Sequence, residues 1–198
     1  MAQNKGDRPL KGELTRTFFC LPLPGQLREK IASLLPGLQK ENLGFRWVRP
    51  EQYHITLKFC GDITADEINT LMESTSRKLR ERSPGEICLK LQAIGAFPNT
   101  HRARVVFIEV MGDTEKLGRL AALIETAAAA AGIPRETRPF RPHLTLARTR
   151  RPGPAKINFP DWTELEGWVN KKVVLMKSEL HPSGPVYTKL QEWPLKQQ

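Results

Sequence analysis

His54-Ile55-Thr56-Leu57 and His143-Leu144-Thr145-Leu146 are two copies of one tetrapeptide, in which a histidine and a threonine alternate with aliphatic residues. The copies lie in different halves of the 198-residue chain and contain two of its four histidines. Chance gives two such copies with a probability on the order of 10⁻³ in a chain of this composition. The repeat therefore indicates a duplicated structural unit.

Each copy has the alternation of a half-buried β-strand. Successive side chains of a strand point to opposite faces, so the histidine and threonine share one face and the aliphatic pair shares the other. If the two strands converge, one imidazole can deprotonate a nucleophile and the second can protonate a leaving oxygen. The threonines can then hydrogen-bond phosphoryl oxygens. The alternative is two amphipathic strands whose histidines only face water.

Other catalytic patterns are missing around these histidines. A metal site needs three or four ligands, and no Asp, Glu or Cys stands at a fitting offset from His54 or His143. The remaining histidines, His101 and His181, lie in turn-rich segments. The sequence has no Gly-x-Ser-x-Gly elbow, Cys-His signature, phosphate loop or dinucleotide fingerprint. We expect acid-base chemistry without a metal or another cofactor.

Strand and helix patterns follow one another irregularly. Strands are expected at residues 16–21, 53–59, 87–94, 104–110, 172–180 and 186–190. Helices are expected from Gly25 to Lys40, from a Thr64–Glu67 capping box to before Pro84, and from an Asp113 cap to Ala131. Many connections are too short for parallel crossovers, which favours antiparallel pairing with helices on one side. We expect an α+β fold with a flexible head at residues 1–13 and one undivided domain at residues 14–198.

The composition is that of a globular protein with a basic surface. Lys and Arg number 31 against 21 Asp and Glu, a net charge of +10 that attracts polyanions such as nucleic acid. No apolar run is long enough to span a bilayer and no signal peptide is recognised, so we expect a cytoplasmic protein without membrane contact. The three cysteines, Cys20, Cys60 and Cys88, stand among apolar residues and are expected in the core.

The sequence around both motifs resembles the two-histidine phosphoesterase superfamily, and within it the RNA 2′,3′-cyclic phosphodiesterases formerly called 2′-5′ RNA ligases. The resemblance covers nearly the whole chain. Besides the motifs, it rests on Arg16-Thr17-Phe18-Phe19, Trp47-Val48-Arg49-Pro50, Arg104-Val105-Val106-Phe107, Phe140 to Arg148, Ser178-Glu179-Leu180 and Tyr187-Thr188-x-Leu190. It implies a bilobal, pseudo-twofold arrangement of antiparallel sheets with helices packed outside, in which each lobe supplies one His-x-Thr strand to a central cleft.

The resemblance also implies an activity and a role for each motif residue. Such enzymes hydrolyse the 2′,3′-cyclic phosphate at an RNA end to a 2′-phosphate, and some join RNA ends through a 2′-5′ bond. By this resemblance His54 is the proton donor to the 3′ leaving oxygen, and His143 is the proton acceptor that activates water. Thr56 and Thr145 hold the phosphate. The residues alone support the pairing without deciding which histidine is the acid.

Three further residues are candidates for substrate contact. Arg148 matches an arginine of this family, although strict alternation along its strand sends it to the opposite face unless the strand bends or ends. Arg141 belongs to a run that can bind an RNA backbone or form a solvated charged segment, and the run consists of Arg135, Arg138, Arg141, Arg148, Arg150 and Arg151. Phe19, like Phe18 and Trp47, can stack a base, whereas aromatic residues in apolar strands are more often core.

Two other functions stay open at this point. A phosphoesterase of small cyclic nucleotides or of ADP-ribose cyclic phosphate needs the same two dyads, and its basic surface is then incidental. A non-catalytic module that binds RNA or a nucleotide needs no proton-transfer groups, so the two intact dyads argue against it. We expect a monomer that acts on RNA with a 2′,3′-cyclic phosphate end, since no long heptad or exposed apolar helix predicts assembly.

Overall fold

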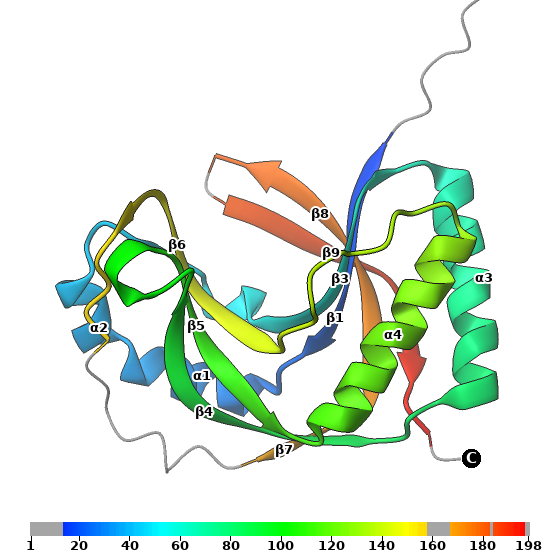
Figure 1. The fold of residues 1–198 in the computed structure, drawn as a ribbon, viewed down its shortest axis with the longest axis horizontal. Helices are drawn as coiled ribbons and strands as arrows, with labels where there is room; N and C mark the ends of the chain where they lie inside the picture. The colour runs from blue at the N-terminus through cyan, green and yellow to red at the C-terminus, as the bar shows by residue number, and fades with distance from the viewer. Residues whose placement is uncertain (1–13, 158–166, 183, 197–198) are drawn as a thin grey trace, which may run out of the picture.

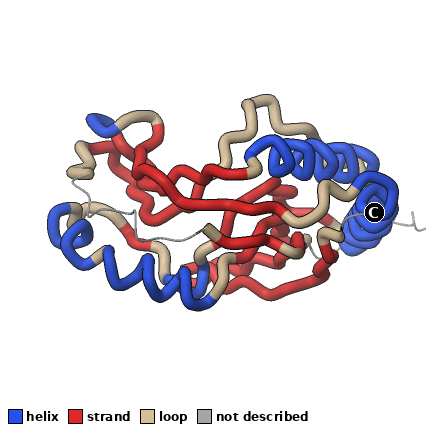
Figure 2. The backbone as a smooth tube through the Cα atoms, turned by 90° about the horizontal axis from the view of Figure 1, so that it is seen from below, coloured by secondary structure: helices blue, strands red, loops and turns tan. Residues whose placement is uncertain are grey.

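A curled antiparallel sheet organises the molecule, with helices packed outside it (Figures 1 and 2). The structure is a computed structural model that describes residues 14–157, 167–182 and 184–196. The head expected at residues 1–13 lies outside the described residues. The α+β class expected from the sequence is confirmed, because strands that pair only antiparallel, among the pairings described, combine with two helical layers.

The described residues form nine strands and four α-helices. The strands are β1 (Thr15–Pro22), β2 (Arg46–Trp47), β3 (His54–Ile63), β4 (Ile87–Phe97), β5 (Ala103–Gly112), β6 (His143–Gly153), β7 (Trp168–Asn170), β8 (Lys172–His181) and β9 (Gly184–Pro194). The helices are α1 (Gly25–Leu34), α2 (Pro36–Glu41), α3 (Ala65–Arg82) and α4 (Thr114–Ala130), with short 3-10 turns η1 (Pro50–Gln52) and η2 (Thr100–Arg102).

The order of the strands has pseudo-twofold symmetry. The sheet runs β7-β4-β5-β6-β3-β1-β8-β9, and β2 pairs with β6 outside this path. The motif strands β3 and β6 are therefore the central pair. Outward from them, β1 corresponds to β5, β8 to β4 and β9 to β7. The centre of the symmetry lies at the Ile55–Leu144 pair, the only register pair recorded between β3 and β6 in the described chain.

The main core fixes which way the motifs face. Ile55 and Leu144 are fully buried in one apolar cluster with helix residues such as Leu71 of α3 and Ile124 of α4. Figure 1 shows α3 and α4 side by side over one part of the sheet, while α1 and α2 cover another part. Burying the aliphatic residues on the helix side turns the histidines and threonines to the opposite face of the sheet.

One predicted helix is divided in two. The apolar spacing from Gly25 to Lys40 predicts a continuous helix, whereas the structure ends α1 at Leu34 and starts α2 at Pro36. Proline has no backbone N–H to donate and its ring clashes with the preceding turn, so it is tolerated only in the first turn of a helix. Both pieces still bury their apolar face, through Ile31 and Leu38.

The helix starts test two predicted caps. The capping box of Thr64 and Glu67 is confirmed, because the Thr64 hydroxyl accepts from the Glu67 N–H while the Glu67 carboxylate accepts from the Thr64 N–H. Asp113 is the N-cap residue of α4 as predicted, but its side chain makes no capping hydrogen bond. Its carboxylate instead accepts from the Cys88 backbone N–H at 3.1 Å and lies 3.3 Å from Lys116 Nζ.

The cysteines are not all in the core. Cys20 and Cys60 are buried as expected, whereas Cys88 is exposed because strand alternation places it between the inward-facing Ile87 and Leu89. Burial raises the pKa of the Cys20 thiol to about 12 and that of Cys60 to about 11, so both stay protonated.

None of the helices in the described residues combines the length and the apolar character that a membrane span requires.

Candidate active site

The two motifs meet at the centre of the sheet. His54, Thr56, His143 and Thr145 are all half-buried and lie on the face away from the helices. Because β3 and β6 run antiparallel about the Ile55–Leu144 pair, each histidine comes next to the threonine of the other motif. The predicted convergence of two polar dyads is therefore what the topology produces.

Both imidazoles are held by the same kind of bond. Nδ1 of His54 lies 2.7 Å from the carbonyl oxygen of Gln52, and Nδ1 of His143 lies 2.7 Å from the carbonyl oxygen of Arg141. A carbonyl oxygen can only accept, so in each ring Nδ1 carries the hydrogen. Nε2 is then the atom that is left to exchange a proton with a substrate.

The threonines have different partners. Thr56 Oγ1 lies 3.0 Å from Nε2 of its own histidine, and it donates to that nitrogen when the imidazole is neutral. Thr145 Oγ1 instead accepts from Nη2 of Arg148 at 3.4 Å. One hydroxyl thus stands beside the nitrogen that exchanges protons, and the other stands beside a permanent positive charge.

A β-bulge in β3 follows the first motif. The adjacent β1 residues Phe19 and Cys20 stand opposite Lys58 and Thr56, so Leu57 is the extra residue. Leu57 and Lys58 are both buried, which breaks the alternation that the sequence predicts. The bulge shifts the following residues by one position relative to the faces of the sheet.

The same bulge follows the second motif. The adjacent β5 residues Val106 and Phe107 stand opposite Ala147 and Thr145, so Leu146 is the extra residue in β6. Leu146 and Ala147 are both buried. Bulges at equivalent positions of the two central strands show that the internal duplication extends beyond the tetrapeptide.

The bulges bring one more residue per motif to the site. After the bulge in β6, Arg148 is on the face of Thr145 and bonds to it, which resolves the conflict between strict alternation and the predicted contact. The equivalent residue after the bulge in β3 is Phe59, whose side chain is 58% exposed. Sequence reasoning missed Phe59, although reading both motifs two residues further would have matched it to Arg148.

Burial and positive charge lower the proton affinity of both rings. Burial, with smaller contributions from Arg148 and His143, lowers the pKa of His54 to about 4, although the Gln52 carbonyl opposes the change. The pKa of His143 is lowered by burial and Arg148, against the effect of the Arg141 carbonyl. Both imidazoles are therefore neutral at pH 7 in the free protein, and both lie within electrostatic reach of Arg148.

The family model of the LigT-like phosphoesterases matches this chain twice, over residues 21–107 and 108–187. Each match contains one His-x-Thr motif. The chain belongs to the LigT-like phosphoesterase family. It is accordingly an enzyme, and the family resemblance that the motifs suggested is confirmed.

Relatives and solved structures agree with this assignment. The RNA 2′,3′-cyclic phosphodiesterase of Thermus thermophilus is 32% identical over 187 residues, which are 91% of this chain and 90% of that protein. The protein of the same name from Methanocaldococcus jannaschii is 28% identical over 90% of this chain and 99% of its own length. The crystal structure of apo E. coli LigT has a TM-score of 0.75 at 26% identity and covers 94% of this chain and 100% of its own. E. coli LigT has also been solved with 3′-AMP.

Different aromatic side chains surround the two histidines of this LigT-like phosphoesterase. The ring of His54 lies 4.9 Å from Phe18 and 5.4 Å from Tyr187, measured between centroids. The ring of His143 lies 5.2 Å from Phe97 and 5.5 Å from Phe107. Each imidazole therefore has an apolar wall that restricts its rotation and contributes to its low pKa.

A glycine makes room for the Phe107 ring that packs against His143. The ring of Phe107 lies over Gly95 of the neighbouring strand, and a Cβ at Gly95 would be 2.6 Å from Phe107 Cζ. Any larger residue would push this ring away from its place beside the histidine. Sequence reasoning missed Gly95, because a glycine inside a strand pattern only signals close approach of some neighbour.

The prediction that Phe19 contacts substrate is wrong. Its side chain is fully buried and packs against Trp193 at 5.8 Å between ring centroids. Phe18, on the other face of β1, is the residue that lies against His54. The alternation that separates the two rings was visible in the sequence, but which of the two faces points to the helices was not.

The arginine run is partly paired. Arg138 forms an ion pair with Glu136 at 3.2 Å, whereas Arg141, Arg150 and Arg151 are exposed. Arg141 contributes its backbone carbonyl to His143, and its side chain is exposed beside the site. Whether Arg141 binds substrate stays a prediction.

The bulge in β3 buries a charge beneath the site. The Lys58 side chain is 2% exposed, and its Nζ donates to the two carboxylate oxygens of Glu125 in α4 and to the carbonyl of Pro134. A buried ammonium is tolerated only with such full pairing. This pair links motif one to the start of the arginine run.

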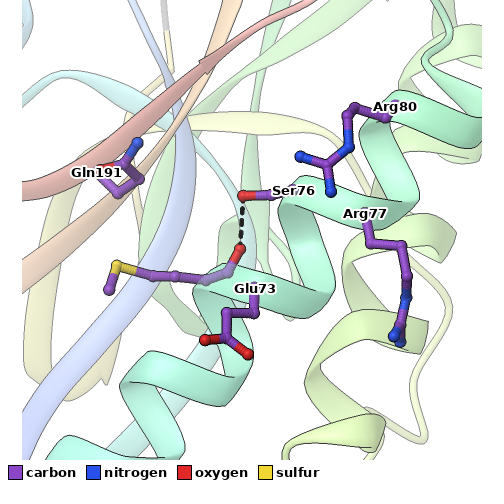
Figure 3. A pocket seen from close by; sticks show the side chains of 6 residues that line it. Glu73, Ser76, Arg77, Arg80 and Gln191 are labelled. Atoms are coloured by element: carbon purple, nitrogen blue, oxygen red, sulfur yellow. Dashed lines mark hydrogen bonds between the residues drawn. The ribbon is translucent and has the colours of Figure 1, made fainter.

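Outside the two motifs, the described chain offers little that could form a second site. No group of three or more His, Cys, Asp or Glu side chains gathers as a metal site anywhere in the described ranges. A hollow between α3 and β9 is lined by residues that include Glu73, Arg77 and Gln191 (Figure 3). Ser76 in this hollow is bonded to the Met72 carbonyl and to Trp193 Nε1, and neither motif reaches it.

Proposed function

We propose that this LigT-like phosphoesterase hydrolyses the 2′,3′-cyclic phosphate at the end of an RNA to a 2′-phosphate, without a metal. The observation that carries the proposal is the pair of facing His-Thr dyads, in each of which a carbonyl fixes the histidine Nδ1 and leaves Nε2 as the nitrogen for proton exchange. A pair of positioned imidazoles is what general acid-base catalysis requires. The names of the Thermus and Methanocaldococcus relatives support the substrate.

The proposed step moves two protons and exchanges two bonds at phosphorus. A water oxygen attacks phosphorus while Nε2 of His143 takes the water proton. The bond from phosphorus to the 3′ oxygen breaks, and Nε2 of His54 donates a proton to that oxygen. This assignment of acid and base follows the family resemblance. The product is a 2′-phosphate with a free 3′ hydroxyl, and the two rings then re-exchange their protons with solvent.

Three side chains stabilise the phosphoryl oxygens in this mechanism. The Arg148 guanidinium supplies a charge that is already beside Thr145, and the two threonine hydroxyls supply hydrogen bonds. Donors that are fixed before the reaction stabilise developing charge without reorganising. Thr56 can bond to the phosphate only by leaving His54 Nε2, which frees that nitrogen for its proton.

The acid must gain its proton together with the substrate. Free His54 has a pKa of about 4, so at neutral pH it holds no proton to donate. An anionic cyclic phosphate between the rings offsets the positive charge of Arg148 and favours the imidazolium form. Substrate binding and protonation of His54 are thus coupled in this proposal.

Phe59 supplies a surface for the terminal base. Its ring is 58% exposed and packs against Phe18 at 5.8 Å between centroids, while Phe18 in turn lies against His54. Stacking on an aromatic ring is the usual way in which an unpaired base is held. The solved complex of E. coli LigT with 3′-AMP supports a nucleotide-sized site in this fold.

RNA is favoured over a small cyclic nucleotide by charge. The net charge of +10 and the exposed arginines around motif two suit a longer phosphate backbone. The same groups can catalyse 2′-5′ joining when the 5′ hydroxyl of a second RNA replaces water, since the bond changes at phosphorus are the same.

The test is hydrolysis of an oligonucleotide with a 2′,3′-cyclic phosphate end in the presence of EDTA. We expect a 2′-phosphate product at undiminished rate, and faster turnover of the oligonucleotide than of 2′,3′-cyclic AMP at low salt. Loss of turnover that zinc or magnesium restores would contradict the metal-free mechanism. Equal turnover of both substrates at every salt concentration would favour the small-nucleotide alternative.

A further inference from the structure

The β8–β9 hairpin makes contacts with motif one that the proposed mechanism does not use. The hairpin is one edge of the sheet, and Figure 1 shows its free end extending toward the half that contains β5 and β6. Arg46 of β2 donates from Nη2 to the Pro182 carbonyl near this end at 2.8 Å. The free end is thus tied to the opposite half of the molecule.

Gln52 forms a second tie and also holds the catalytic ring. Its side-chain Nε2 donates to the Pro185 carbonyl at the start of β9, and its Oε1 accepts from the Arg49 N–H at 3.3 Å. Its backbone carbonyl is the acceptor for Nδ1 of His54. A single residue therefore bonds the hairpin, the η1 turn and the imidazole.

The hairpin places an aromatic side chain on the same imidazole. Tyr187 follows Pro185 by two residues, so both lie on one face of β9. The Tyr187 ring meets His54 edge-on at an interplanar angle of 87° and Phe18 at 70°. Tyr187 also lies within electrostatic reach of Arg148 and Arg16.

In the part of the chain that the structure describes, the second motif has no such arm. The residue equivalent to Gln52 is Arg141, whose carbonyl also accepts from its histidine but whose side chain is exposed. The ring of His143 is walled by Phe97 and Phe107, which belong to the strand pair β4 and β5 that already neighbours it. Only the first half of the site depends on a strand pair from the far end of the chain.

We propose that the β8–β9 hairpin is a positioning arm for His54, and that Gln52 is the positioning residue that couples the arm to the imidazole. Breaking the bond from Gln52 to Pro185 releases the start of β9, and Tyr187 then no longer confines the ring. The kinetic consequence rests on the proposed function. The orientation of the ring does not, so it is tested separately in the free protein.

The test compares Gln52→Ala and Gln52→Glu with Lys116→Ala in the full chain. Glutamate keeps an oxygen for the Arg49 N–H but has no N–H for Pro185, so both Gln52 variants remove the tie. Lys116 Nζ donates to the Glu86 carbonyl at 3.2 Å and pairs with the Asp113 carboxylate at 3.3 Å, away from either motif. Lys116→Ala therefore serves as a control that removes a side-chain-to-carbonyl bond together with a surface ion pair. A stable fold in all three variants is checked by urea unfolding.

Two readouts decide the proposal. In cyclic-phosphate hydrolysis we expect both Gln52 variants to lower kcat on the order of 10- to 100-fold with little change in KM, because a misplaced acid affects the chemical step. In NMR titrations of the free protein we expect the His54 midpoint to rise toward 6.5 in both variants and to stay unchanged in Lys116→Ala. The carboxylate of Gln52→Glu raises the His54 midpoint by its charge alone, so Gln52→Ala is the deciding variant. A His54 midpoint that does not move in Gln52→Ala would overturn the proposal, whether or not the chain hydrolyses the cyclic phosphate.

Discussion

The two halves of the active site share a backbone and differ in the side chains placed on it. Each half has the same tetrapeptide, the same bond from Nδ1 to a carbonyl two residues earlier, and the same bulge. The residue that the bulge places on the face of the dyad is Phe59 in one half and Arg148 in the other. In the proposed function the duplicated scaffold supplies two proton-transfer groups, and the positions after the bulges divide base binding from phosphate binding.

The proposed division lets a symmetric fold bind an asymmetric substrate. A terminal nucleotide has an aromatic base on one side and an anionic phosphate on the other. In the proposed function Arg148 binds the anion, and exposed Phe59 offers the complementary apolar surface. If the two halves were chemically identical, a nucleotide could bind in two opposite orientations, and neither histidine would have a fixed role.

The largest effect is expected from removing either histidine. His54→Ala and His143→Ala should each lower kcat on the order of 10²- to 10⁴-fold, because each removes one proton-transfer group. The double variant should lose less than the product of the two losses, since the groups act as a unit. Kinetics on the cyclic-phosphate oligonucleotide measure this. Near-wild-type rates in either single variant would show that the repeated tetrapeptide is structural.

Removing the side chain that follows each bulge tests the proposed separation of phosphate binding by Arg148 from base binding by Phe59. Arg148→Ala should lower kcat on the order of 10²- to 10³-fold, as expected for loss of a fixed donor to a charged oxygen. Phe59→Ala should act mainly on KM, by about 1 to 3 kcal/mol for one stacked base. Phe59→Tyr keeps the stacking surface and is the matched control. A Phe59→Ala variant that loses kcat at unchanged KM would contradict this assignment.

The threonines should have smaller effects that differ between the halves. Thr56→Ala and Thr145→Ala should each cost about 1 to 3 kcal/mol for a lost hydrogen bond to a charged group. Thr56 bonds to His54 Nε2, so its loss should also displace the pH profile of kcat/KM, whereas Thr145 bonds to Arg148 and its loss should not. Profiles of the two alanine variants, with the serine variants as controls, would separate these outcomes.

Much of this site could be predicted from the sequence, because it depends on local periodicity. The alternation of His, Thr and aliphatic residues places the dyads on one face, and that prediction is confirmed. The bulges at Leu57 and Leu146 could not be predicted, since a bulge depends on the partner strand. Phe59 was missed for that reason, and alternation alone left open the side of the sheet taken by Arg148.

Long-range packing accounts for the other differences. Phe18 and Phe19 are equivalent in hydrophobicity and both are buried. Only the position of the helices decides that Phe19 joins the main core, whereas Phe18 lies in a smaller cluster and contacts His54. The contact of Tyr187 with His54 joins residues far apart in the chain, so no window of sequence contains it. Pro36, in contrast, carried a local signal for ending a helix that the apolar spacing outweighed in the prediction.

The pH dependence of kcat/KM should reflect the low proton affinity of the free site. Activity needs one ring protonated and the other neutral, and the free His54 has a pKa of about 4 while that of His143 also lies below 6.5. We therefore expect a bell-shaped profile with its maximum between about pH 4 and 6.5. The profile of kcat should lie at higher pH, because bound phosphate raises both values. A kcat/KM maximum above pH 7.5 would contradict the proposed protonation states.

The smallest expected effect is on stability, and it should distinguish the two histidines. His54 has a pKa of about 4 when folded and an ordinary value of 6.5 when unfolded, so between these values the unfolded chain binds a proton that the folded chain does not. The contribution of His54 to the free energy of unfolding should therefore be greatest above pH 6.5 and should fall as the pH is lowered toward 4.

Replacing each histidine in turn measures how much it contributes to this decrease in the free energy of unfolding. We expect His54→Gln to flatten the decrease in stability between pH 7 and pH 5 more than His143→Gln, because the pKa of His54 is displaced further. The carboxylates with lowered pKa, Glu67, Asp113, Glu136 and Glu192, stay ionised in both states over most of this interval, so they contribute little to its slope. Urea unfolding of the two variants and the wild type at both pH values measures the difference. Equal slopes in the two variants would show that burial, Arg148 and Tyr187 do not set the first imidazole apart from the second.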